Sequence, residues 1–210
     1  MQILLTAATS KEIEFISGGG NNKTDTLVSG VGSPSSLYHL QKRIHQIDYD
    51  LVIQAGIAGS FTNDLELGST VIVERDVFAD LGVEEKGRFI NIFDMGLSGR
   101  NDFPFDNGWL INKNPLLNKI KLELVRAVTV NKLSDTIQQK KLYADMYKAR
   151  IETMEGAALH YLCLQEEIPF IQLRSISNYV GERDKSKWKM DKALGNLKTE
   201  LLQLMNLLNL

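Results

Sequence analysis

The sequence contains a single cysteine, Cys163, so no disulfide can form within the chain. It has no apolar run near the ~20 residues that a membrane-spanning helix needs. The 24 basic and 26 acidic side chains nearly balance, and the chain therefore lacks the basic face of a typical nucleic-acid-binding protein. The apolar start from Met1 to Leu5 is too short for a secretory signal. We therefore expect a soluble cytoplasmic protein with neither a membrane nor a nucleic-acid partner.

Several motifs of cofactor and nucleotide chemistry are also missing. Gly30-Val31-Gly32 is not a dinucleotide-binding fingerprint, because Ser35 occupies the position of the third glycine. Neither a G-x-x-x-x-G-K-[ST] phosphate loop nor a G-x-S-x-G nucleophile elbow occurs. His39, His45 and His160 are scattered, without a spacing typical of zinc ligands. We therefore expect no metal and no cofactor.

The sequence does contain a regular alternation of strand and helix patterns. Apolar runs predict strands at residues 2–8, 25–29, 51–54, 67–74, 122–130 and 169–177. Patterns of helical period predict helices at residues 33–47 and 134–147, after Gly156, and from Ser186 onward. A turn is expected at residues 18–22, where glycines and asparagines cluster. The alternation favours one domain over residues 1–210 with a three-layer α/β/α architecture.

Two segments leave alternatives open. In the terminal helix, Leu202 and Leu207 widen the leucine stripe, which indicates either broad packing on the sheet or a subunit contact. Residues 78–108 are rich in Gly, Asp, Asn and aromatics and lack a clean period. An irregular segment of this length is more often a binding loop or lid than a linker.

Three polar side chains stand where predicted strands end. They are Glu12, Glu155 and Asn178. Ligands of α/β sheets bind at the carboxyl ends of strands, so these three side chains can face one cleft. Each also has a purely structural interpretation. Glu12 completes a T-x-x-E capping box, Glu155 can complement a helix dipole, and Asn178 can be an ordinary turn residue.

The motifs TAATSKEIE, SGVGSPSS, QAGIAGSF, and ETMEGAA followed by IPFIQLRSISN resemble those of the purine nucleoside phosphorylase/nucleosidase superfamily. Within it, the chain is similar to the branch of methylthioadenosine/S-adenosylhomocysteine nucleosidases and futalosine hydrolases, over nearly its whole length. The resemblance implies a nucleoside phosphorylase-like fold with a central mixed sheet. It also implies a small-molecule nucleoside substrate and a homo-oligomer, a dimer or larger.

The resemblance implies roles for individual residues. Glu12 corresponds to the carboxylate that activates the attacking water, and Glu155 to the acid that accepts hydrogen bonds from the ribose hydroxyls. Met154 corresponds to the residue that packs under the ribose. Gly59 corresponds to a residue of a glycine-containing turn near the sugar and the base. Arg174 corresponds to a residue that supports the site without contacting the substrate. A carboxylate near the water and the sugar suits a reaction that passes through an oxocarbenium-like state.

Two departures from the relatives bear on the reaction. Phosphorylases place arginines in glycine-rich loops to hold phosphate, whereas residues 6–10, 30–36 and the QAGIAGS segment contain none, which favours water as nucleophile. Asn178 stands where adenine-specific nucleosidases have aspartate. Its NH2 can donate to N7 or O6 of hypoxanthine, which an ionised aspartate would repel. Asparagine cannot protonate N7, however, so this proton must come through water or be replaced by hydrogen bonding.

We therefore expect a hydrolase that releases hypoxanthine, with Glu12 and Asn178 as catalytic residues. This pattern, with FADLG and RSISNYVGERDKSKW, most resembles the futalosine hydrolases, which release hypoxanthine and dehypoxanthine futalosine in menaquinone biosynthesis. Trp188 and residues 78–108 are then expected to enclose the benzoate-bearing end of the substrate. The alternatives are a methylthioadenosine/S-adenosylhomocysteine- or inosine-type nucleosidase, and a nucleoside-binding protein without activity.

Overall fold

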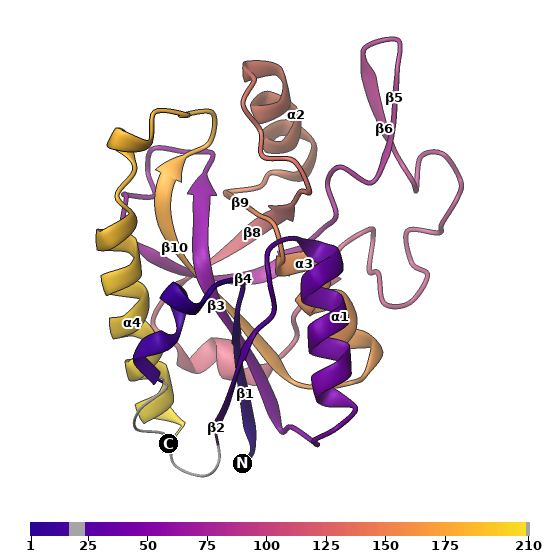
Figure 1. Ribbon diagram of the computed structural model, residues 1–210. Helices are drawn as coiled ribbons and strands as arrows, with labels where there is room; N and C mark the ends of the chain where they lie inside the picture. Colours follow the sequence, from indigo (N-terminus) through magenta and orange to yellow (C-terminus); the bar gives the residue numbers. More distant parts are fainter. Residues whose placement is uncertain (17–23, 209–210) are drawn as a thin grey trace.

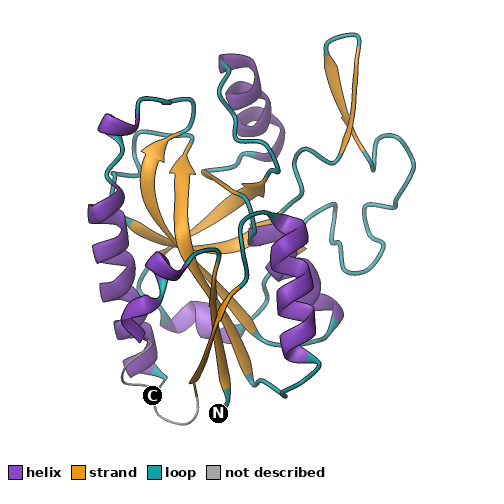
Figure 2. Cartoon of the chain, viewed as in Figure 1, coloured by secondary structure: helices purple, strands orange, loops and turns teal. Residues whose placement is uncertain are grey.

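The computed structural model describes residues 1–16 and 24–208, so the turn expected at residues 18–22 lies outside the described residues. An eight-stranded sheet lies at the centre and helices cover it on both sides (Figures 1 and 2). Its strands are β1 (Ile3–Ala7), β2 (Thr24–Val28), β3 (Leu51–Ser60), β4 (Thr70–Asp76), β7 (Leu110–Ile111), β8 (Glu123–Thr129), β9 (Ile151–Thr153) and β10 (Phe170–Tyr179). The helices are α1 (Ser33–Ile44), α2 (Ile137–Tyr147), α3 (Gly156–Gln165) and α4 (Met190–Leu207).

The sheet is mixed and partly closed. Its order is β10-β4-β8-β9-β3-β1-β2, and β7 pairs with β4. Strand β3 also pairs with β10, so β3, β10, β4, β8 and β9 form a ring. The pairs β10–β4 and β3–β9 are antiparallel, whereas β1–β3, β3–β10 and β8–β9 are parallel. The expected α/β fold with a central mixed sheet is confirmed.

The core lies on both faces of the sheet. On one face α4 packs on β10, β3 and β4, with Leu197, Leu201 and Leu204 buried against the strands. On the other face α1 and α3 lie side by side, and Leu40 and Leu159 are buried there. Strands covered on both faces read as continuous apolar runs, which is why the sequence revealed them. None of the helices in the described residues has the length and apolar character to cross a membrane.

Two of the predicted elements have a boundary that lies four or more residues from the expected one. Strand β3 runs to Ser60, six residues beyond its predicted end at Gln54, through the glycines taken as a corner. Helix α4 begins at Met190 rather than near Ser186. Residues before it form a short 3-10 turn, η4 (Lys185–Lys187), and the Lys189 backbone N–H donates to the Ser177 carbonyl at 2.8 Å. This bond ties the segment to the end of β10, so the helix starts only after it.

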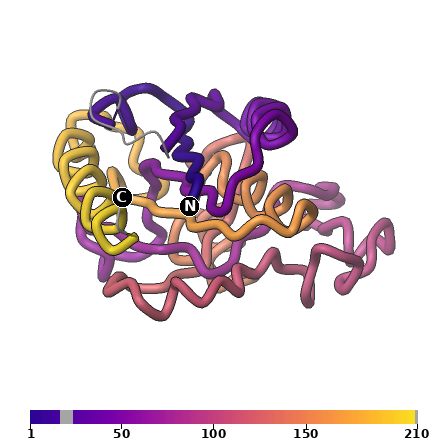
Figure 3. Tube along the Cα trace, turned by 90° about the horizontal axis from the view of Figure 1, so that it is seen from below, coloured from indigo at the N-terminus to yellow at the C-terminus, as the bar shows by residue number. Residues whose placement is uncertain are grey.

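Residues 78–108 contain regular structure that the sequence did not reveal. A hairpin of β5 (Gly82–Glu85) and β6 (Arg88–Asn91) projects away from the sheet (Figures 1 and 3). Its turn residues Lys86 and Gly87 both have positive φ, as a two-residue hairpin turn requires. Leu97 and Phe103, farther along the same segment, are 71% and 66% exposed.

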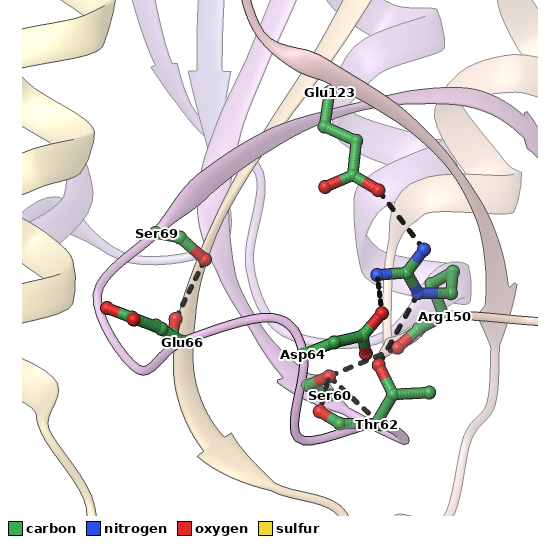
Figure 4. Close-up of polar contacts among 7 residues, drawn as sticks. All are labelled: Ser60, Thr62, Asp64, Glu66, Ser69, Glu123 and Arg150. Carbon is green, nitrogen blue, oxygen red and sulfur yellow. Dashed lines mark hydrogen bonds and ion pairs between the residues drawn. The ribbon is translucent and has the colours of Figure 1, made fainter.

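Arg150 holds the ends of β3 and β9 together (Figure 4). Its guanidinium donates to Asp64 at 2.8 Å and to Glu123 at 3.1 Å, and its carbonyl accepts from the Phe61 backbone N–H at 2.9 Å. Its Nε also points at the Thr62 hydroxyl, 3.4 Å away. Surface ion pairs contribute little individually, but this group fixes where β9 begins beside β3. The pairing of these two strands positions part of the site described next.

Candidate active site

A cavity of about 520 Å³ opens at the carboxyl ends of β1, β3 and β10. This volume lies within the range of sites for small molecules. Of the six residues to which the resemblance gives a role, five line the cavity: Glu12, Gly59, Met154, Glu155 and Asn178. Arg174 does not line it and lies fully buried, with 1% of its surface exposed. Strand ends far apart in the sequence thus bring these residues to one place.

Glu12 belongs to the capping box and also lines the cavity. It ends the 3-10 turn η1 (Ser10–Glu12), where its Oε2 accepts from the backbone N–H and the hydroxyl of Thr9, both at 2.9 Å. Its Oε1 accepts from the Ile57 backbone N–H at 3.2 Å. The cap holds one carboxylate oxygen, and the same hydrogen bonds orient the side chain at the cavity wall. The two interpretations are therefore compatible.

Glu155 is the residue just before α3, and a backbone N–H from a distant part of the sequence holds its carboxylate. Its Oε1 accepts from the Gly32 N–H at 2.8 Å, and Gly32 has φ 88°, a conformation that favours glycine. No donor among the described residues bonds to Oε2, and the side chain lines the cavity. Burial raises the pKa of Glu155, the Arg174 charge lowers it, and the Glu12 charge raises it further. The two carboxylates and the arginine therefore form one electrostatic group.

Arg174 lies behind this pair, against the backbone of β3. It is in register with Gly56, and a Cβ there would collide with Nη1 of Arg174. That Cβ would also lie 3.2 Å from Oε1 of Glu12. Arg174 donates through Nη2 to Gln54. The missing side chain at Gly56 is thus what admits a buried guanidinium beside the carboxylates, as glycines in strand interiors often allow.

Asn178 lies at an irregularity of β10. The register with β3 shifts between Ile176 and Asn178, so that Ser177 is the extra residue. Bulges of this kind are common beside active sites, where they re-aim side chains. The Ser177 hydroxyl donates to Oδ1 of Asn178 at 2.8 Å, and Nδ2 of Asn178 donates to the Tyr179 carbonyl at 3.1 Å. The amide oxygen is therefore engaged, and one N–H of the amide remains for a ligand.

Gly59 and Met154 complete the wall. A Cβ at Gly59 would lie 3.3 Å from Nδ2 of Asn178, so the carboxamide lies over this glycine. Gly59 belongs to β3 and not to the corner expected from the resemblance. Met154 is half-buried in the turn between β9 and α3, and its carbonyl accepts from the Ser33 hydroxyl at 3.1 Å. Trp188 also lines the cavity, whereas residues 78–108, expected to enclose the substrate, contribute none of its lining.

Glu152 and Ser134 were not identified from the sequence. Both line the cavity, and Glu152 is buried on β9, two residues before Met154. The available signal was an acidic residue between Ile151 and Thr153, inside an otherwise buried strand. A second group of buried polar residues lies outside the cavity lining. Asp76, Gln172 and His160 lie on the α3 side of the sheet, where burial raises the pKa of Asp76 to about 7 and lowers that of His160 to about 4.

Comparison with known proteins places the chain in a family. The sequence model described as the phosphorylase superfamily matches residues 9–206. The chain belongs to the phosphorylase superfamily. A futalosine hydrolase from Thermus thermophilus is 30% identical over 174 residues, 81% of this chain and 76% of that protein. A 5'-methylthioadenosine/S-adenosylhomocysteine nucleosidase from Colwellia psychrerythraea is 28% identical over 167 residues, 73% of this chain and 66% of that protein.

Solved structures of the superfamily agree on the fold. The nucleosidase from Colwellia psychrerythraea, in complex with adenine, matches with a TM-score of 0.81 and 18% identity, covering 98% of this chain and 95% of that one. At this identity the likeness shows the fold alone. The two sequence relatives are both hydrolases of N-glycosyl bonds, and the chain is an enzyme of this class.

Proposed function

We propose that the protein is a futalosine hydrolase. It cleaves the N-ribosyl bond of futalosine with water and releases hypoxanthine and dehypoxanthine futalosine, a step of menaquinone biosynthesis. The observation that carries the proposal is the fixed carboxamide of Asn178. Its oxygen is engaged by Ser177, and its remaining N–H is available for the acceptor edge of a 6-oxopurine. The futalosine hydrolase relative supports the same substrate.

Glu12 is the residue that activates water in this proposal. Its carboxylate is buried at the cavity wall and is oriented by Thr9 and Ile57. Within hydrogen-bond reach of a water molecule it takes up the proton as the water attacks the anomeric carbon. Its negative charge also stabilises the positive charge that develops on the ribose in the transition state. No covalent intermediate is required.

Glu155 and Met154 hold the ribose. The free Oε2 of Glu155 accepts hydrogen bonds from the ribose hydroxyls, while Gly32 holds the other oxygen in place. Met154 supplies an apolar surface beneath the sugar. Arg174 touches no substrate, but its buried charge lowers the pKa of Glu155 and so favours the ionised form that accepts those hydrogen bonds.

Asn178 stabilises the leaving base. As the bond to the ribose breaks, negative charge accumulates on hypoxanthine, and an N–H directed at N7 or O6 counters that charge. Asparagine has no acidic proton, so the proton that the base finally takes comes from water. A catalytic role for Asn178 therefore means hydrogen bonding and not proton transfer.

Water, and not phosphate, is the nucleophile in this proposal. Of the residues that line the cavity, Lys11 and Arg183 carry a positive charge, and both are exposed at its rim. The Arg174 guanidinium does not line the cavity; it lies behind the carboxylates and is engaged with Gln54. A phosphate dianion beside Glu12 and Glu155 would thus meet two carboxylates, while the two lining cations are exposed and the buried guanidinium is already engaged.

We further propose that the protein works as a homo-oligomer in the cytoplasm. Exposed apolar side chains support a subunit contact: Leu202 and Leu207 on α4 are 40% and 49% exposed. Isolated exposed leucines are ordinary, but two on one helix extend the stripe noted in the sequence. The near balance of charge supports a protein without a nucleic-acid partner.

A comparison of three nucleosides tests the substrate. Purified protein is offered futalosine, inosine and methylthioadenosine, and the free base is identified by chromatography. Release of hypoxanthine from futalosine in preference to the other two supports the proposal. The nucleosidase relative makes a methylthioadenosine-type activity the second candidate, and adenine without hypoxanthine would establish it instead. A nucleoside-binding protein without activity would release no base from any of them.

A further inference from the structure

Three residues on neighbouring strands form a row across the cavity floor. Gly59 of β3 pairs with Glu152 of β9 on one side and with Asn178 of β10 on the other. Paired residues of neighbouring strands direct their side chains to the same face of the sheet. Glu152 and Asn178 accordingly both line the cavity, with a glycine between them.

Gly59 places no side chain between these two. A Cβ at Gly59 would lie 3.1 Å from Val180 and 3.3 Å from Nδ2 of Asn178, so a methyl group there would press against the carboxamide. A ligand that lies over the β3 backbone at Gly59 can therefore meet a carboxylate on one side and a carboxamide on the other. A planar ring with polar atoms along one edge suits this arrangement.

Glu152 is held there as a hydrogen-bond acceptor. It is 4% exposed, and its Oε1 accepts from the Ser134 N–H at 3.1 Å while its Oε2 accepts from the Ser134 hydroxyl. Burial raises the pKa of Glu152, while the donors of Ser134 and the charge of Arg183 lower it. A carboxylate has about four acceptor positions, so Ser134 leaves some of them unused. Buried polar atoms normally find partners, and a ligand donor can supply one here.

We infer that Glu152 accepts the N1–H of a 6-oxopurine base while Asn178 donates to the N7 and O6 side of the same ring. This inference rests on the proposed function and deepens it. Hypoxanthine carries a hydrogen at N1, which suits a carboxylate. Adenine has a lone pair at N1, which a carboxylate repels. Glu152 thus recognises the donor at N1 of hypoxanthine, and Asn178 recognises an acceptor on the N7 and O6 side. Adenine has the reverse, an acceptor at N1 and a donor at its amino group.

The test is the affinity of free bases for Glu152→Gln. Isothermal titration gives the Kd of hypoxanthine and of adenine for wild type, for this variant, and for Glu166→Gln as a control at the far end of α3. Glutamine keeps an acceptor for Ser134 but can present an NH2 to the base. We expect about 10- to 100-fold weaker hypoxanthine binding and unchanged or tighter adenine binding, as for loss of a hydrogen bond to a charged group. Equal loss for both bases, or no loss, would overturn the inference.

A measurement on the wild type tests the same contact without requiring a variant that folds. The Kd of 1-methylhypoxanthine, which has a methyl group in place of the N1 hydrogen, is compared with that of hypoxanthine. We expect at least about 10-fold weaker binding, because the carboxylate loses its donor. Equal binding would exclude a contact between Glu152 and N1.

The outcomes separate this inference from the proposed function. If futalosine yields hypoxanthine and Glu152→Gln keeps the wild-type preference between the bases, the inference fails while the proposed function stands. Glu152 then serves only to hold the loop at Ser134. If the wild type releases adenine and no hypoxanthine, the proposed function fails and takes the inference with it.

Discussion

The Arg174 guanidinium and the Glu12 carboxylate both border the space that a side chain at Gly56 would fill. The arginine is buried behind the cavity, and the carboxylate lies at its wall. A strand glycine thereby brings a permanent positive charge next to the residue assigned to water activation.

Gly56→Ala adds only one methyl group but is expected to lower both stability and activity. The new methyl group meets Nη1 of Arg174, so the guanidinium or the strand must move. We expect a loss of about 1–3 kcal/mol in unfolding free energy from overpacking. We also expect kcat/KM to fall by up to about 100-fold, because catalytic groups are displaced. Gly195→Ala is the matched control: Gly195 is exposed on α4 with no atom near the added Cβ, and alanine there should stabilise by about 0.5–1 kcal/mol. Equal activity of both variants would contradict the account.

Glu12→Gln is expected to remove turnover and keep binding. Glutamine retains an oxygen for the Thr9 cap but cannot take a proton from water. Loss of a general base corresponds to about 100- to 10,000-fold in kcat, whereas the Kd of hypoxanthine should change little. Glu14→Gln, an exposed position in the next turn, should behave as wild type. Residual kcat within a few-fold of wild type would assign Glu12 to the cap alone.

Asn178→Asp is expected to change which base is preferred. An ionised aspartate repels the N7 and O6 acceptors of hypoxanthine, so we expect the preference for 6-oxopurine over adenine nucleosides to fall by about 10- to 100-fold. The ratio of kcat/KM for inosine and adenosine measures this. Asn206→Asp, exposed on α4, provides the control for the added charge. An unchanged ratio in Asn178→Asp would mean that the base is recognised elsewhere.

Asp76 should make stability depend on pH in the neutral range. Burial raises its pKa from 3.8 to about 7, so the folded protein binds this proton more tightly than the unfolded chain. The resulting stabilisation is complete below about pH 4 and is lost as the pH rises through 7. The full effect is about 4 kcal/mol. Asp76→Asn carries no titrating group, and its stability relative to wild type should therefore increase from pH 4 to pH 8 in urea unfolding. If the unfolding free energies of the two proteins changed in parallel with pH, the raised pKa of the buried Asp76 carboxyl would be contradicted.

Local patterns were sufficient for much of the fold. Buried strands such as β1 are largely apolar on both faces, and helices such as α1 show their period, so both were predictable. Strand β3 was predicted too short because Gly56 and Gly59 look like a turn. Their role in the strand depends on Arg174 and Asn178, more than 100 positions later in the chain. The start of α4 likewise depends on a tertiary hydrogen bond, from Lys189 to Ser177.

The site was predictable where it coincides with strand ends. Glu12 and Glu155 follow strands, Asn178 lies in the last residues of β10, and the structure brings all three to one cavity. Glu152 was not predictable in this way. It lies within a strand, and its approach to the cavity follows from the pairing of β9 with β3, which no local pattern encodes. Long-range strand pairing is the part of the fold that a single sequence specifies least directly.

The most direct test of the central claim is the identity of the two products formed from futalosine in a buffer that contains phosphate. Mass spectrometry distinguishes a free sugar product from its 1-phosphate ester and identifies the base. With Glu12 activating water, and with the lining cations Lys11 and Arg183 exposed to solvent, we predict hypoxanthine and unphosphorylated dehypoxanthine futalosine at a rate that phosphate does not change. A sugar 1-phosphate, or the absence of hypoxanthine, would contradict the account.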